Sequence, residues 1–112
     1  METKKQKLKE LRRLFREQVL KRDNNQCAFC DCKEDLDAHH ITNRNYMPMY
    51  GYVISNGITL CNAHHALAEH YSRAILKESM EEFSPENLYK IIDSSYDKAL
   101  SDCVKLEEGI IG

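Results

Sequence analysis

Apolar residues recur at three- and four-residue steps near the start of the chain, which is the spacing of an amphipathic helix. The recurring positions are Leu8, Leu11, Leu14, Phe15 and Val19, and Lys or Arg fills many of the positions between them. The pattern predicts a basic helix over residues 1–22. The turn-forming sequence Asp23-Asn24-Asn25 is expected to end it.

A helical pattern returns in the second half of the chain. One helix is predicted over residues 62–78, where alanine and leucine are frequent. Another starts at Ser84-Pro85, a favourable N-cap and first-turn pair, and its apolar stripe continues to Val104. We therefore expect one C-terminal helix over residues 84–106, with Cys103 of the stripe in the core.

Short apolar runs typical of strands lie between these helical patterns. Residues 36–41 alternate in character, and residues 52–54 and 58–60 are apolar, with the turn signal Ser55-Asn56-Gly57 between them. The order of one helix, a small β region and further helices predicts the α+β fold class. The length predicts a single domain over residues 1–112.

Length and composition exclude several classes of protein. A chain of 112 residues buries a small core, so a metal ion that joins distant segments would add stability. The sequence has neither a long apolar run nor a signal-peptide pattern, so we expect no membrane partner and a cytoplasmic location. In that reducing compartment the five cysteines favour metal binding or free thiols, and their odd number argues against a disulfide-bonded secreted protein.

The net charge of −2 hides a gradient along the chain. Residues 1–22 contain nine Lys and Arg against three Glu, whereas residues 78–112 contain three Lys against nine acidic residues. A basic end favours a polyanionic partner, although such charges are also typical of a solvated helix face. If the partner is a nucleic acid, the candidates for contacts with its backbone are Lys9, Arg12, Arg13 and Arg16.

Two short-spaced pairs of Cys and His have the spacing of a structural zinc site. They are Cys27-x-x-Cys30 and Cys61-x-x-His64. Zinc is bound by four nitrogen or sulfur ligands in a tetrahedron, and two such pairs from separate segments supply them. Cys32 is a further candidate that would either replace Cys30 or take no part.

Three other histidines lie close to these pairs in the sequence. Adjacent residues of a strand point to opposite faces, so His39 and His40 are poor partners for one ion and suit two roles, a metal ligand and a base. His65 follows His64 on a predicted helix and is turned away from it by about 100°, so it can face a second site.

These residues resemble the HNH endonucleases of the His-Me finger superfamily. The resemblance lies in Cys27-x-x-Cys30, in Asp-Ala-His-His-Ile at residues 37–41, and in Asn-Gly-Ile-Thr-Leu-Cys-Asn-Ala-His-His at residues 56–65. It covers roughly residues 16–70. The resemblance implies a small ββα-metal core over about residues 16–78 with a zinc site, flanked by the basic N-terminal helix and the C-terminal helix.

The resemblance also implies roles for single residues. His40 would be the general base that activates water, His39 and His65 would hold a catalytic divalent metal, and Asn56 would tether the loop and orient the base. Many members have Asp where this chain has His39, so Mg²⁺, Mn²⁺ and Ni²⁺ all stay open as the catalytic ion. Glu69 is either a further ligand or a solvated glutamate.

The function that the resemblance implies is hydrolysis of DNA by an endonuclease or nickase. The alternative is a zinc-stabilised nucleic-acid-binding module on the HNH scaffold that does not cut, against which the presence of all the implied catalytic residues argues. Arg44 is a candidate phosphate ligand, and the aromatic loop over residues 46–52 either stacks on bases or covers the core. The small size suits a phage or mobile-element protein that acts alone, as a homodimer or in a larger nuclease-associated complex.

Overall fold

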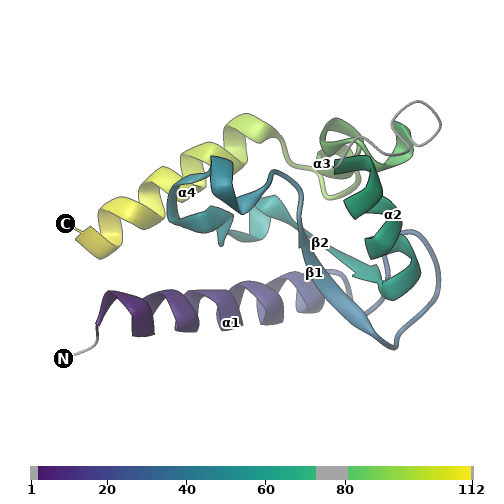
Figure 1. The fold of residues 1–112 in the computed structure, drawn as a ribbon, viewed down its shortest axis with the longest axis horizontal. Helices are drawn as coiled ribbons and strands as arrows, with labels where there is room; N and C mark the ends of the chain where they lie inside the picture. The colour runs from purple at the N-terminus through teal and green to yellow at the C-terminus, as the bar shows by residue number, and fades with distance from the viewer. Residues whose placement is uncertain (1–2, 73–80, 112) are drawn as a thin grey trace.

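A computed structural model describes residues 3–72 and 81–111 of the chain (Figure 1). In these ranges the fold is a small α+β domain, as predicted, with four α-helices and one two-stranded antiparallel sheet. The elements are α1 (Lys4–Arg22), β1 (Leu36–His40), β2 (Gly57–Cys61), α2 (Asn62–Ser72), α3 (Pro85–Ile91) and α4 (Tyr96–Ile111). None of the helices in the described ranges is both long and apolar enough to cross a lipid bilayer.

The first helix confirms the prediction for the N-terminal residues. Thr3 caps α1, because its hydroxyl accepts from the backbone of Gln6 while the Gln6 side chain accepts from the backbone of Thr3. At the other end Asn24 and Asn25 adopt the left-handed conformation, which asparagine tolerates and a helix does not contain. The turn signal therefore ends the helix where the sequence places its end.

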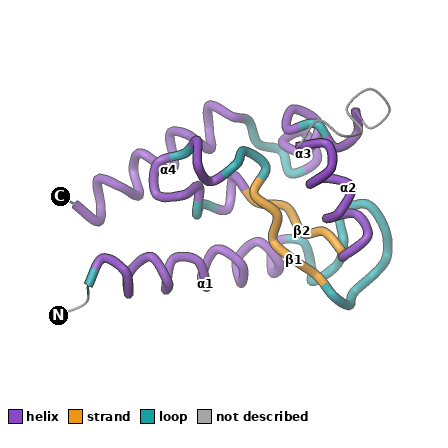
Figure 2. The backbone as a smooth tube through the Cα atoms, in the orientation of Figure 1, coloured by secondary structure: helices purple, strands orange, loops and turns teal. Residues whose placement is uncertain are grey.

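The sheet differs from the prediction in one strand. β1 and β2 pair with His39 opposite Ile58 and His40 opposite Gly57. The strand predicted over residues 52–54 is wrong, because these residues belong to a long connection over residues 41–56 (Figure 2). That connection turns through three short 3₁₀ segments, η1 (Arg44–Tyr46), η2 (Pro48–Gly51) and η3 (Ile54–Asn56). Their backbone hydrogen bonds join residues close together in the sequence.

The C-terminal region also differs from the prediction. The single helix expected over residues 84–106 is wrong, because it divides into α3 and α4 at a turn where Asp93 has a φ of 55°. Ser94 stabilises this turn by donating to the backbone oxygen of Ser55 at 2.8 Å, and Ser95 caps the next helix. α4 can therefore turn back and pack on η2 and η3 (Figure 1). Of the helix predicted over residues 62–78, the part over 73–78 lies outside the described residues.

The core joins the helices to the sheet. Every residue of β2 is buried, and the fully buried Leu88 and Cys103 come from α3 and α4, so the core position predicted for Cys103 is confirmed. At the other side of the sheet, α1 approaches β2 closely at Gly57. A Cβ atom at Gly57 would lie 2.5 Å from Val19 and 2.8 Å from Phe15, so this packing needs glycine.

We predict that Gly57→Ala destabilises the fold by about 1–3 kcal/mol, because the added methyl group overpacks the contact between α1 and β2. Gly109→Ala is the matched control: it lies in α4 with no atom within 4 Å of its Cβ position, so it should stabilise by about 0.5–1 kcal/mol. Urea unfolding of the zinc-loaded proteins measures both changes. Equal stability of the two variants would contradict the close packing at Gly57.

Candidate metal sites and the cleft beside them

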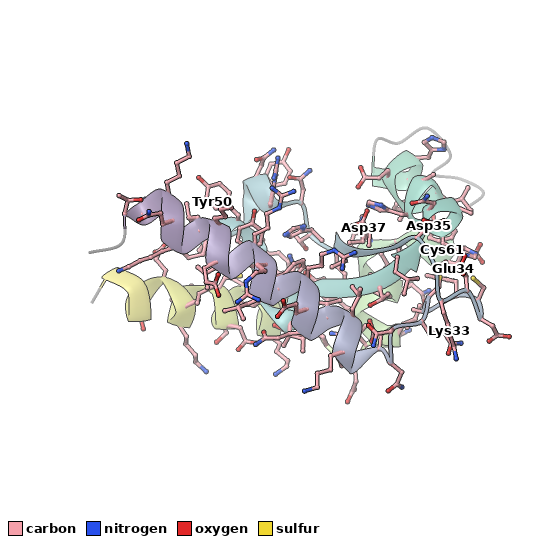
Figure 3. All side chains as sticks on the ribbon, turned by 90° about the horizontal axis from the view of Figure 1, so that it is seen from below. Lys33, Glu34, Asp35, Asp37, Tyr50 and Cys61 are labelled. Carbon is pink, nitrogen blue, oxygen red and sulfur yellow. The ribbon has the colours of Figure 1, made fainter. Side chains whose placement is uncertain are left out.

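Three cysteines and one histidine converge at one end of the sheet. Cys27 and Cys30 come from the loop after α1, Cys61 ends β2, and His64 lies in the first turn of α2. Their Sγ and ring-nitrogen atoms lie within 4.8 Å of one another. Figure 3 labels Cys61 at this end of the molecule. The four residues that the spacing pairs in sequence are thus brought together in space.

The distances in this cluster fit a tetrahedral zinc site. With Zn–S bonds of about 2.3 Å and Zn–N bonds of about 2.0–2.1 Å, tetrahedral edges are about 3.8 Å between sulfurs and about 3.6 Å between sulfur and nitrogen. Cys30 Sγ lies 3.9 Å from Cys61 Sγ, and Cys27 Sγ lies 3.6 Å from His64 Nδ1. Cys61 Sγ is closer to that nitrogen, at 3.2 Å. The donor set can therefore hold a zinc ion.

Local contacts influence the ionisation of one thiol and determine which cysteines belong to the cluster. The backbone of His64 lowers the pKa of Cys61 to about 6, which favours the thiolate that zinc binds. Cys32 lies outside the cluster, and its exposed thiol donates to the backbone oxygen of Glu34 at 3.3 Å. Between the two cysteines that the sequence leaves open, the structure therefore places Cys30 in the cluster.

A second cluster of possible metal ligands lies on the sheet face toward α2. It contains His39 of β1 together with His65 and Glu69 of α2, whose ligand atoms lie within 4.8 Å of one another. One carboxylate oxygen of Glu69 lies 3.6 Å from His39 Nδ1 and 3.4 Å from His65 Nε2. The other ring nitrogen of His65 lies 3.6 Å from Asp37, which is labelled in Figure 3. The Asp37 carboxylate can orient the His65 ring.

His40 has surroundings quite different from those of His39. Its ring stacks on Phe15 of α1 with 4.5 Å between centroids, and Tyr52 lies at 5.4 Å. Burial lowers the pKa of His40 to about 4, and the positive charges of Arg44 and Arg12 act in the same direction. The imidazole is therefore neutral at neutral pH. Its Nε2 atom is buried and has no hydrogen-bond partner among the described residues.

Asn56 is fully buried and holds both ends of the connection between the strands. Its Nδ2 donates to the backbone oxygens of Thr42 and Gly51 at 3.1 and 3.3 Å, and its Oδ1 accepts from the Thr42 backbone at 3.0 Å. The Tyr89 hydroxyl of α3 also donates to this oxygen at 2.8 Å. Gly51, with a φ of 67°, lies against both Asn56 and the His40 ring, where a Cβ atom would lie 2.5 Å from Asn56 Nδ2.

A cleft of about 750 Å³ opens over these residues. It is lined by His39, His40 and His65, by residues of α1 that include Arg12, and by Arg44 of the connection between the strands. The loop over residues 46–52 contains both buried and exposed side chains. Its methionines 47 and 49 are buried, whereas Tyr46 is 77% exposed.

Two residues of this site escape sequence reasoning. Tyr89 is part of the apolar stripe of a predicted helix, and nothing local distinguishes it from a core residue. Phe15 likewise follows the helical pattern of α1. Its stacking on His40 depends on the packing of α1 against the sheet, which no short motif records.

No protein-family model matches this chain, and no curated protein sequence or solved structure is significantly similar to it. The likeness to HNH endonucleases is therefore a likeness of motifs. The function has to be inferred from the arrangement of the side chains in the two clusters and the cleft.

We predict that the purified protein contains one tightly held zinc ion per chain and that Cys27→Ser loses both the ion and cooperative unfolding, because a structural zinc contributes folding energy directly. Cys32→Ser is the matched control and should keep the zinc and the melting transition. Elemental analysis and thermal circular dichroism measure the two properties. The zinc assignment fails if the metal-free protein melts like the loaded one.

Proposed function

We propose that this chain is a metal-dependent endonuclease or nickase of the HNH type that hydrolyses phosphodiester bonds of DNA. The observation that carries the proposal is the position of His40. A neutral imidazole lines a cationic cleft, one residue away from a cluster of possible metal ligands. A proton acceptor beside a cation site is the arrangement that hydrolysis of a phosphate diester needs.

The cluster of His39, His65 and Glu69 would hold the divalent ion. Two imidazoles and one carboxylate suit Mn²⁺, Ni²⁺ and related ions well, whereas Mg²⁺ prefers oxygen ligands. When bound there, such an ion supplies Lewis-acid stabilisation of negative charge on the phosphate. Asp37, next to Nδ1 of His65, would keep Nε2 of that ring directed at the ion.

His40 would take a proton from a water molecule at Nδ1, the ring nitrogen that is not enclosed by protein atoms, while the water oxygen forms a bond to phosphorus. The bond between phosphorus and the 3′ oxygen breaks, and that oxygen takes a proton from solvent. The products are then a 5′-phosphate and a 3′-hydroxyl. The low pKa of His40 keeps the acceptor nitrogen free of a proton before the reaction.

Asn56 and Phe15 act on His40 without taking part in bond making. Asn56 holds Gly51, which lies against the ring, and Thr42, two residues after His40, and Phe15 supports the ring by stacking. Both interactions limit the orientations open to the imidazole. A base held in one orientation accelerates the reaction more than a mobile one, because the geometry for proton transfer is formed in advance.

We predict that the protein nicks supercoiled plasmid in Mn²⁺, Ni²⁺ or Mg²⁺ and that His40→Ala lowers the rate by about 10²–10⁴-fold, the usual contribution of a general base. His70→Ala is the matched control, since this exposed histidine of α2 lies outside both clusters. Gel electrophoresis of the plasmid measures the rate, and zinc content confirms that each variant is folded.

Equal cutting by His40→Ala would show that His40 is not the base. If neither protein cuts in any of these ions, the nuclease proposal fails, and a binding module that does not cut becomes the better interpretation of the cleft and the zinc cluster.

A further inference from the structure

The first helix forms a wall of the cleft instead of standing apart from it. Lys9, Arg12 and Arg16 line the cleft and lie at steps of three and four residues, which places them on one face of α1. Phe15, which precedes the last of them, stacks on His40. The cationic face is therefore fixed beside the candidate base by a direct ring contact.

The positive charges of this helix differ in their partners, although Arg13 also lines the cleft. Arg13 is neutralised by Glu10 and by Glu17, with 2.6 Å between its guanidinium and Glu17. By contrast, the side chains of Lys9 and Arg12 form no hydrogen bond or ion pair with any residue in the described ranges. The protein thus neutralises the arginine beside the stripe and leaves the charges within it available.

The connection between the strands also contributes a cation to the cleft, Arg44. The Arg44 side chain forms no hydrogen bond or ion pair in the described part of the chain, and the amides Asn43 and Asn45 flank it. The charges of Arg12 and Arg44 both act on His40, so both guanidinium groups lie near the ring. Like charges that face one cleft repel each other, and a bound polyanion relieves that repulsion.

We propose that the Lys9, Arg12 and Arg16 face of α1 binds the phosphate backbone of a DNA strand, which lies between this helix and Arg44. The proposal rests on the proposed function, since it assigns the substrate path of that site. Lys9 and Arg16 are separated by about 10 Å along the helix axis. That distance is longer than the spacing of neighbouring phosphates on one strand, so the face can contact more than one phosphate of a strand past His40. Arg16 contributes less, because its guanidinium already donates to the Leu36 backbone at 3.1 Å.

The test is the binding of a fluorescein-labelled DNA duplex, measured by anisotropy between 50 and 200 mM KCl without a catalytic ion. All proteins carry His40→Ala, so that none can cut. Lys9→Gln with Arg12→Gln removes two phosphate contacts, which should lower the slope of log affinity against log salt by about 1.8 and weaken binding up to about 60-fold at 0.1 M salt. Glutamine keeps most of each aliphatic stem.

The matched control is Lys7→Gln with Lys21→Gln. It removes the same charge from exposed positions of the same helix that do not line the cleft. It should change the slope by less than half as much. Zinc content and thermal melting check that both double variants fold, which their exposed positions favour.

Two results would overturn the proposal: equal losses of affinity in the two double variants, which would mean that only net charge matters, and no loss in either. An acidic peptide of equal charge that binds as tightly as DNA would also overturn it, because the surface would then not select phosphates. Failure of the nuclease proposal is recognisable separately. A protein that never nicks plasmid but loses affinity only through Lys9 and Arg12 would keep the binding surface and lose the catalysis.

Discussion

The cluster of three thiols and one imidazole is the constraint on which the rest of the site depends. It joins the loop after α1, the end of β2 and the first turn of α2 within a sphere of a few ångströms. His65 follows His64 directly in α2. The contacts of His64 with Cys27 and Cys61 therefore also set the rotation of α2 about its axis. That rotation turns His65 and Glu69 toward His39 on the sheet. A structural ion in the first cluster would therefore position the ligands of the second.

A second framework, without metal, holds His40. The long connection between the strands begins and ends beside the sheet, and the Asn56 side chain links its two ends through two hydrogen bonds with Thr42. Two further bonds join Asn56 to Gly51 within the connection and to Tyr89 of α3. α4 packs on the same connection from outside, where Asp102 accepts from Ser55 at 2.6 Å. The C-terminal helices thus support the loop, while α1 supports the imidazole from its other side.

Much of the fold follows from local patterns, and the errors fall where distant partners decide. The helical spacing and the turn sequence after Arg22 locate α1, because both signals lie within a few residues. The apolar run over residues 52–54 has the pattern of a strand, but a strand needs a neighbouring strand to pair with. Here the backbone groups form hydrogen bonds with residues close by in the sequence. Likewise the apolar stripe over 84–106 hides a turn at Asp93, since the stripe continues on both sides and the turn is stabilised by Ser55, far away in sequence.

The sequence by itself indicated a possible zinc site made of two Cys and His segments, with Cys30 or Cys32 left open, and it separated the roles of His39 and His40. It could do so because ligand spacing and strand alternation are properties of a few consecutive residues. Only the tertiary structure decided that Cys30 and not Cys32 joins the cluster and that Glu69 faces the two histidines. It also decided that α1 lies against His40. These outcomes depend on how segments pack across the sheet, and packing of that kind leaves no periodic trace in the chain.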